Sequence, residues 1–183
     1  MQCSPHETYG LFWTENAAFW QKRNSVNDRK ERSSGDMFYE TAFLKNEEIQ
    51  LILHHTCEAD PSRFWLPTYY FRICDPEGVT MGWCDLRIGH NENTYYGGNI
   101  GYQVEKSYRG HHYAGKAVNL LFELARLHGL TYLIITCDPG NVASRKTCEY
   151  AGGKLIEIAK LPEENDTQSD IGETEKCVYR FVL

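Results

Sequence analysis

A basic, histidine-bearing turn precedes the strongest helical pattern in the chain. The sequence YRGHHYAGKA covers residues 108–117, and an apolar pattern with helical spacing begins at its end. Gly110, Ala114 and Gly115 have little or no side chain, so a bulky ligand could approach the backbone there. The first N–H groups of a helix lack partners within the helix, and the helix dipole favours negative charge at that end. The turn therefore has the chemistry of an anion site.

Positive charge is concentrated around this turn, although the whole chain has a formal net charge of −6. The side chains that supply it are Arg109, His111, His112 and Lys116. Such a concentration favours a phosphate-bearing ligand over a neutral one. The glycines could also serve only the geometry of the turn, and the residues of the turn leave that alternative open.

A metal site on His111 and His112 is a weaker hypothesis. Adjacent histidines rarely point at the same metal, and no nearby Asp, Glu or Cys completes a ligand set. The turn also lacks the G-x-G-x-x-G dinucleotide fingerprint and the G-x-x-x-x-G-K-[ST] phosphate loop. We therefore expect no metal.

The elements around the turn would position it. Residues 98–108 are predicted as a strand, and apolar residues recur at helical spacing over 117–127 until Gly129 ends the pattern. The apolar run at 130–138 is typical of a strand buried on both faces, and 141–153 is predicted as a short helix closed by glycines. A strand–helix–strand crossover makes its two strands parallel, and a split between them would hold a ligand.

The outer segments are expected to complete a mixed sheet with helices on its faces. Residues 68–89 indicate two strands joined by the Asp-Pro-Glu-Gly turn at 75–78, whereas 48–55 could be strand or helix. Further expected elements are a partly helical segment at 1–34, a turn at 91–98, strands at 154–162 and 176–183, and a polar surface loop at 163–173. The last strand could pair across a dimer edge or simply finish the sheet.

Composition limits the function. The chain has 183 residues, of which 42% are apolar, so we expect a single domain over residues 1–183. Its negative charge argues against nucleic acid and anionic membranes as partners, and no apolar run is long enough to span a bilayer. We see no signal peptide. The seven cysteines are scattered without a C-x-x-C motif, which predicts reduced thiols and a cytoplasmic location.

Two motifs resemble the GCN5-related N-acetyltransferase (GNAT) superfamily. The family pattern R/Q-x-x-G-x-G/A corresponds to Arg109, with His112 at the usual glycine and Ala114 at the end. The family pattern N-x-x-S/A-x-x-x-x-E-x-x-G is matched in full by Asn141, Ser144, Glu149 and Gly152. The resemblance covers about residues 98–153, the expected coenzyme A-binding core. The sequence there is also similar to a bacterial subgroup of predicted acetyltransferases.

The resemblance implies a fold and a cofactor. The fold would be α/β (α+β), with a mixed, mostly antiparallel sheet of six to seven strands, helices on both faces and a V-shaped split between strands 4 and 5. Acetyl-CoA would lie in that split as co-substrate, with its pantetheine arm along the fourth strand and its pyrophosphate at the turn. The implied binding residues are Tyr102, Gln103, Val104, Arg109, Gly110, His111, His112, Tyr113, Ala114, Gly115, Lys116, Asn141, Ser144 and Arg145.

The implied chemistry is direct acetyl transfer to a primary amine in a ternary complex. The backbone N–H of Val104 would polarise the thioester carbonyl. Many relatives carry, at the position of Cys148, a tyrosine that protonates the departing thiolate, so here Ser144, Cys148 or water would serve. Tyr150 lies about 200° further round the helix and is expected to face elsewhere. The candidate bases are Glu105, Asp85 and His90.

The acceptor amine is not readable from the sequence and could belong to a small molecule or a protein. The acidic balance favours a cationic acceptor. Aromatic residues at 11–20 and 63–71 could line its pocket or belong to ordinary core packing. The alternatives are a non-catalytic acyl-CoA-binding sensor or assembly module and, more remotely, an unrelated nucleotide-binding protein. We expect a monomer or homodimer.

Overall fold

The computed structural model describes residues 37–162 and 174–183. The helix expected within 1–34 and the surface loop expected at 163–173 lie outside these residues. All that follows concerns the compact unit Phe38–Leu183. In the described part of the chain, no helix is both long enough and apolar enough to cross a membrane.

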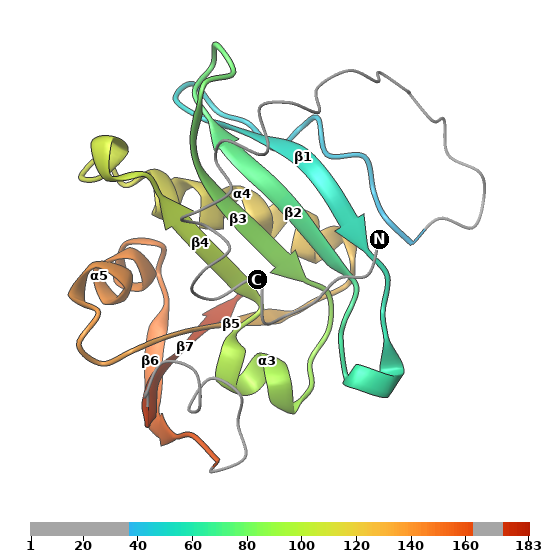
Figure 1. Cartoon of the computed structure of the whole chain (residues 1–183), viewed down its shortest axis with the longest axis vertical. Helices are drawn as coiled ribbons and strands as arrows, with labels where there is room; N and C mark the ends of the chain where they lie inside the picture. Colours follow the sequence, from blue (N-terminus) through green and yellow to red (C-terminus); the bar gives the residue numbers. More distant parts are fainter. Residues whose placement is uncertain (1–36, 163–173) are drawn as a thin grey trace. The chain divides into compact units, whose positions relative to one another are not determined.

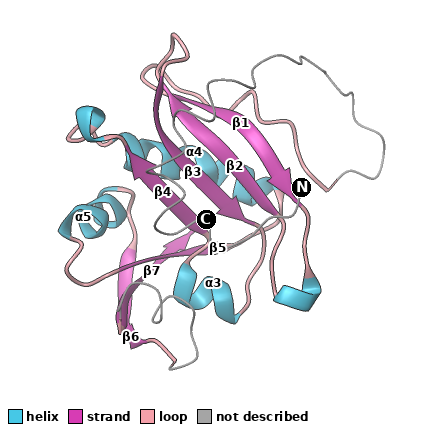
Figure 2. Ribbon diagram, in the orientation of Figure 1, coloured by secondary structure: helices cyan, strands magenta, loops and turns pink. Residues whose placement is uncertain are grey.

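Four antiparallel strands form the first sheet (Figures 1 and 2). In spatial order they are β1 (Gln50–Cys57), β2 (Thr68–Cys74), β3 (Thr80–Arg87) and β4 (Ile100–Val104). The open choice at 48–55 is therefore resolved as a strand. The predicted hairpin between β2 and β3 is confirmed, since Gly78 donates its N–H to the carbonyl of Asp75 over 3.0 Å. β1 thus adds a fourth strand to the three predicted within 68–89 and 98–108.

The turn predicted at 91–98 is wrong, because this segment contains the helix α3 (Glu92–Gly97). Asn91 and Thr94 form a capping box, in which each side chain accepts the backbone N–H of the other. This capping box stabilises the start of a helix in a segment whose glycines had indicated a turn. Two short 3-10 helices, η2 (Pro61–Arg63) and η3 (Lys106–Tyr108), follow β1 and β4.

Three further strands form a second antiparallel sheet. They are β5 (Tyr132–Cys137), β6 (Lys154–Lys160) and β7 (Glu175–Val182), in the order β5-β7-β6. The last strand therefore lies between its two neighbours, so it finishes the sheet and the possibility that it pairs across a dimer edge is wrong. Because β7 lies in the centre of the second sheet, β6 is its outer strand.

Helices cover both faces of this framework. α4 (Tyr113–Leu127) packs against β1, β3 and β4, and its buried side chains join those of β2 and β3 in one core. α5 (Val142–Tyr150) contacts β5 on one side of the second sheet. α3 lies against the other side, where the Thr136 hydroxyl of β5 donates to the Tyr96 carbonyl over 2.9 Å. The expected fold class is confirmed.

The two sheets separate between β4 and β5, and one residue joins them. Asn99 is fully buried and precedes β4. Its N–H donates to the Ile134 carbonyl over 2.6 Å, its Oδ1 accepts the Ile134 N–H over 2.9 Å, and its Nδ2 donates to the Gly89 carbonyl over 2.7 Å. Beyond this junction no ladder pairs β4 with β5 in the described residues. The expected split is therefore present and is closed at one end by Asn99.

The junction predicts a stability effect. Asn99→Ala leaves the buried N–H of Ile134 and the carbonyl of Gly89 without these partners, so we expect a loss of about 1–3 kcal/mol in the free energy of unfolding, measured by urea denaturation. Asn93→Ala is the matched control, because the Asn93 amide is exposed and makes one 3.4 Å bond. A loss in the Asn99 variant no larger than in the control would contradict the role of the junction.

Candidate active site

The open edge of β4 forms one wall of the split. Glu105 donates its N–H to the Met81 carbonyl over 2.9 Å, and Arg87 donates to the Asn99 carbonyl over 2.8 Å. Backbone groups of successive residues in an antiparallel strand alternate between the two sides. The N–H and C=O groups of Tyr102 and Val104 therefore point away from β3, toward β5. This edge can accept an extended ligand as an additional strand.

Gln103 lies between those two residues and differs from them. It is in register with Trp83, and the same alternation turns its backbone groups to β3. The Val104 carbonyl accepts a 3.0 Å bond from Nε of Arg109, which ties the following turn to the end of β4. The predicted backbone contacts to a ligand thus fall to Tyr102 and Val104 rather than to Gln103.

The start of α4 has backbone groups that could bind an anion. His112 is the N-cap residue, and its side chain makes no capping hydrogen bond. The N–H groups of the first turn therefore keep no side-chain acceptor at the cap. Gly110, with φ of +92°, has open space where a Cβ would lie. The turn can thus admit a bulky group to the backbone at Gly110.

Gly115 has a different function from the one expected. It is buried, and a Cβ there would lie 2.4 Å from the Tyr150 ring, so this glycine makes room for α5 rather than for a ligand. The Tyr150 ring also stacks on His112, with centroids 4.4 Å apart and an interplanar angle of 14°. His112 itself has φ of +59°, the left-handed region that glycine adopts without strain. The backbone thus explains why the family places glycine here.

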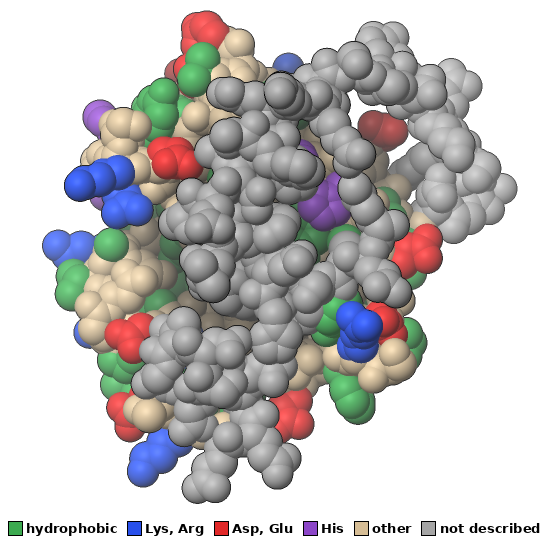
Figure 3. All heavy atoms as spheres, in the orientation of Figure 1, with side chains coloured by type: hydrophobic (Ala, Val, Ile, Leu, Met, Phe, Trp, Pro, Cys, Tyr) green, Lys and Arg blue, Asp and Glu red, His purple; other side chains and the backbone are tan. Residues whose placement is uncertain are grey.

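The charges around the turn are distributed unevenly. Lys116 forms an ion pair with Glu48 at 2.5 Å, so its charge is partly neutralised within the chain. His111 stacks on Tyr113. Figure 3 shows Lys, Arg and His side chains along the margin where Figure 1 places this turn and α5. The exposed members of this basic margin are Lys106, Arg109, His111, His112 and Lys146.

The start of α5 forms the other wall. Oδ1 of Asn141 caps the helix by accepting the Ser144 N–H over 3.0 Å. The Ser144 hydroxyl lies 2.8 Å from the hydroxyl of Tyr102, which crosses the split from β4. Arg145 donates to the Pro139 carbonyl over 3.4 Å and folds back on its own loop. Of the three residues expected here, Ser144 is the one brought into contact with β4.

Thiols line the floor behind Ser144. Cys148 is fully buried and its Sγ lies 3.7 Å from the Tyr102 hydroxyl. A hydrogen bond between the Cys148 and Cys137 thiols, followed by burial, raises the pKa of Cys148. The same hydrogen bond lowers the pKa of Cys137. Asn99, just before β4, bonds to Ile134 in β5, and Tyr102, further along β4, reaches this floor at the end of β5. β4 and β5 therefore run in the same direction.

The oxidation state of the cysteines is mixed. The free thiols are Cys74, Cys84, Cys137, Cys148 and Cys177, all buried, as the sequence predicted. Cys57 departs from that prediction because it is disulfide-bonded. In the described residues no cluster of three or more His, Cys, Asp or Glu side chains could hold a metal ion.

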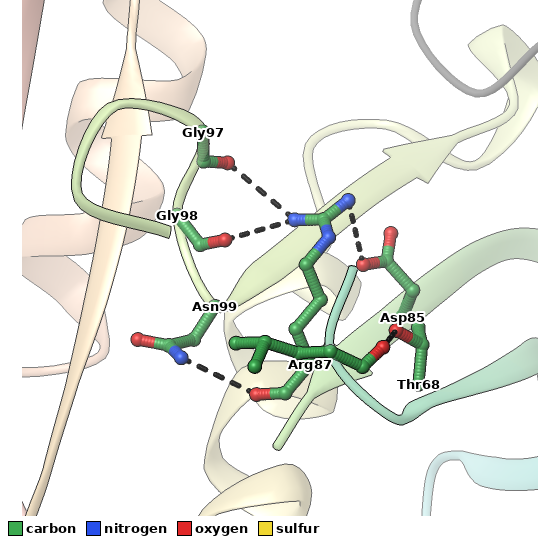
Figure 4. A network of polar contacts seen from close by, with 7 residues as sticks. Thr68, Asp85, Arg87, Gly97, Gly98 and Asn99 are labelled. Atoms are coloured by element: carbon green, nitrogen blue, oxygen red, sulfur yellow. Dashed lines mark hydrogen bonds and ion pairs between the residues drawn. The ribbon is translucent and has the colours of Figure 1, made fainter. Parts of the chain in front are cut away.

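The three candidate bases lie in different surroundings. Asp85 is 4% exposed and pairs with Arg87 at 3.1 Å (Figure 4). Burial raises the pKa of Asp85, and the Arg87 charge opposes that rise. Arg87 also donates to the Gly98 carbonyl over 2.9 Å, so this network holds the entry to β4 beside the Asn99 junction. Asp85 therefore has a structural role at the entry to β4 rather than the role of a base.

His90 and Glu105 differ from Asp85. His90 stacks on Tyr132 with centroids 4.0 Å apart, and lines a pocket of about 250 Å³ on the α3 side of the second sheet. Cys137 and Cys148 lie on the opposite side of that sheet. Glu105 is exposed and directly follows Val104 at the end of β4. Of the three, Glu105 is the carboxylate next to the open strand edge.

Two side chains of the site were missed by the sequence analysis. The Tyr102 side chain was considered only for its backbone, and Tyr150 was expected to face elsewhere. The alternation of side chains along a strand places the Tyr102 ring on the same face of β4 as Ile100 and Val104. Nothing in the sequence indicated that Tyr150 packs on Gly115, because that contact joins two helices.

The split between two sheets, the open strand edge and the uncapped helix start together offer backbone groups that could bind an extended anionic ligand. Residues 12–154 match the model of the family described as acetyltransferase (GNAT) domain. The chain belongs to this GNAT acetyltransferase family. No curated protein sequence matches the chain.

Several solved acetyltransferase structures are similar to this chain at low identity. The microcin self-immunity acetyltransferase MccE, in complex with acetyl-CoA and AMP, is 21% identical, with a TM-score of 0.50 over 63% of this chain and 61% of that one. The ribosomal alpha-N-protein acetyltransferase RimL, in complex with coenzyme A, is 18% identical, with a TM-score of 0.50 over 67% and 64%. A ribosomal-protein-alanine acetyltransferase from Vibrio fischeri is 18% identical, with a TM-score of 0.49 over 63% and 61%. The chain thus spans 61–64% of the length of these structures.

The backbone of His112 predicts the effect of restoring glycine. In His112→Gly, relief of the left-handed conformation, about 1 kcal/mol, offsets loss of the Tyr150 stack, also about 1 kcal/mol, so stability should change little. Coenzyme A affinity, measured by calorimetry, should be equal or higher because the turn becomes more open. Tyr150→Ala is the control that keeps His112 and removes the stack, together with the contact of the ring with Gly115. A tenfold weaker affinity in His112→Gly, absent from Tyr150→Ala, would instead make His112 a ligand contact.

Proposed function

We propose that this protein is an N-acetyltransferase that moves the acetyl group of acetyl-CoA to a primary amine by direct transfer in a ternary complex. The observation that carries the proposal is the edge of β4, where the backbone groups of Tyr102 and Val104 face the split. This edge leads directly into the basic turn and the uncapped start of α4. An extended arm and an anionic group, joined as in acetyl-CoA, fit these two features in that order.

Different residues of the split would bind different parts of acetyl-CoA. The N–H groups from Gly110 to Ala114 would hold the pyrophosphate, with Arg109 supplying charge. Tyr102 and Val104 would pair with the pantetheine arm. The Asn141 side-chain amide, whose oxygen caps α5, would donate to the same arm through its NH2 group.

The chemistry needs a polarised carbonyl and a neutral amine. The Val104 N–H is fixed by the strand and can donate to the thioester oxygen as negative charge develops on it. Glu105 follows it and is open to water, so it can accept the amine proton through a solvent molecule. No metal enters this proposal.

The acceptor is a primary amine of a small molecule or a protein. The net charge of −6 favours a cationic acceptor by steering. We propose a monomeric or homodimeric cytoplasmic enzyme that binds neither nucleic acid nor membranes. The five free thiols support the reducing location, and the Cys57 disulfide counts against it. The rival function is a non-catalytic acyl-CoA sensor, favoured by one observation: Cys148 replaces the usual helix tyrosine.

A binding and turnover experiment separates these functions. Acetyl-CoA binding is measured by calorimetry, and thiol release is followed with spermidine, free lysine and a short peptide with an unblocked N-terminus as probe amines. Thiol release that depends on an added amine, with the acetylated amine detected by mass spectrometry, is expected. Tight binding without release for any probe would favour the sensor, and ATP binding without acetyl-CoA binding would contradict both.

The position of Glu105 predicts a pH-dependent effect. Most amines are protonated at pH 7, so a base matters most at low pH. Glu105→Gln should lower kcat/KM about tenfold or more at pH 6–7, and the deficit should shrink toward pH 9, where more amine is already neutral. Glu77→Gln, in the exposed hairpin turn between β2 and β3, is the control. Full activity of Glu105→Gln across pH 6–9 would remove this residue from the mechanism.

A further inference from the structure

We propose that the hydroxyl of Tyr102 is the donor that protonates the departing thiolate, taking from β4 the position that relatives fill from helix α5. The inference rests on the proposed function. It begins with one contact set: the Tyr102 hydroxyl lies 2.8 Å from the Ser144 hydroxyl, 3.3 Å from the Ser144 carbonyl and 3.7 Å from Sγ of Cys148. The phenol thus reaches the side chain at helix position 148 itself.

The two positions exclude one another. Cys148 is fully buried, and its short side chain ends against the Tyr102 hydroxyl. A tyrosine at position 148 would extend several ångströms beyond Sγ, toward the space at the Tyr102 hydroxyl. Loss of the helix tyrosine and presence of the strand tyrosine are therefore one coupled arrangement. The hydroxyl is still delivered to the split, but from the opposite wall.

The split places a thioester beside this hydroxyl. A ligand that enters from the turn before α4 runs back along β4 to the Val104 N–H, beside the Tyr102 side chain. Asn99 and Ile134 close the split beyond that point. The reactive end of the ligand must therefore stop near Tyr102, where a phenol and the Ser144 hydroxyl meet.

The proton balance closes without a further reactant. The amine nitrogen forms a bond to the carbonyl carbon, and the carbon–sulfur bond breaks with its electron pair passing to sulfur. Tyr102 gives its hydroxyl proton to that sulfur, and coenzyme A leaves as the thiol. The proton lost by the amine returns to the phenolate through the Ser144 hydroxyl or water. The products are the acetylated amine and a thiol, with Tyr102 neutral again.

The surroundings keep the phenol in the required state. Burial raises the pKa of Tyr102, so the hydroxyl stays protonated across the range in which the enzyme would work. A thiolate formed beside it is also poorly solvated and therefore basic, which favours its protonation. Because Tyr102 does not titrate in this range, removing its hydroxyl should lower kcat by a constant factor from pH 6 to 9.

The first test is Tyr102→Phe, which keeps the ring and removes the hydroxyl. With acetyl-CoA and the best probe amine found among spermidine, lysine and the peptide, kcat should fall tenfold to a hundredfold or more, with KM for acetyl-CoA within about threefold. Tyr95→Phe, on α3, is the matched control and should retain wild-type kcat. A Tyr102→Phe enzyme with kcat within twofold of wild type overturns the inference.

Ser144 and the helix position supply two further readouts. Ser144→Ala should cost less than Tyr102→Phe, and a larger loss in Ser144→Ala would give the role of donor to the serine. Tyr102→Ala combined with Cys148→Tyr should recover at least tenfold of the kcat lost in Tyr102→Ala, because the phenol then returns from α5. Recovery supports the exchange of positions, and a folded double variant without recovery contradicts it.

The two proposals fail in distinguishable ways. A wild-type protein that releases no thiol with any probe amine overturns the proposed function and this inference together. An active wild-type enzyme that is indifferent to loss of the Tyr102 hydroxyl overturns the inference alone. Circular dichroism and coenzyme A affinity of each variant show whether a lost rate comes from lost folding.

Discussion

The separation of β4 from β5 is the constraint on which the rest of the structure depends. Two strands that run in the same direction side by side would normally pair, and pairing would consume the backbone groups of Tyr102 and Val104. Asn99 prevents this by joining the strands at one point and occupying the Ile134 backbone with its side chain. The ion pair of Asp85 with Arg87 holds the chain as it enters this point. Buried polar groups thus serve to keep one strand edge open.

The far end of the split depends on a contact between two helices. Gly115 lets Tyr150 of α5 approach α4, and the Tyr150 ring then stacks on His112 at the N-cap. The helix start that faces a ligand is therefore supported from behind by the helix that forms the opposite wall. A single aromatic side chain thus holds α5 against the start of α4 at this end, as Asn99 holds β4 against β5 at the other.

Sequence alone predicted the local features well and the long-range ones poorly. The hairpin at 75–78, the helix after His112 and the helix after Asn141 follow from turn chemistry, helical spacing and caps, which act over a few residues. The α3 helix was missed because glycines outweighed its capping box. The central place of β7, the packing of Tyr150 and the commitment of Asp85 to Arg87 arise between distant segments, where spacing carries no information.

A hydroxyl delivered from β4 differs physically from one delivered from α5. The Val104 N–H and the Tyr102 side chain are two residues apart on one strand, so the rigidity of that strand would set the distance between the proposed carbonyl donor and the proposed thiolate donor. A helix-borne tyrosine would make the same distance depend on how α5 packs on β5 and α4. In this chain α5 is instead free to hold Ser144 and the buried thiols of Cys137 and Cys148 behind the phenol.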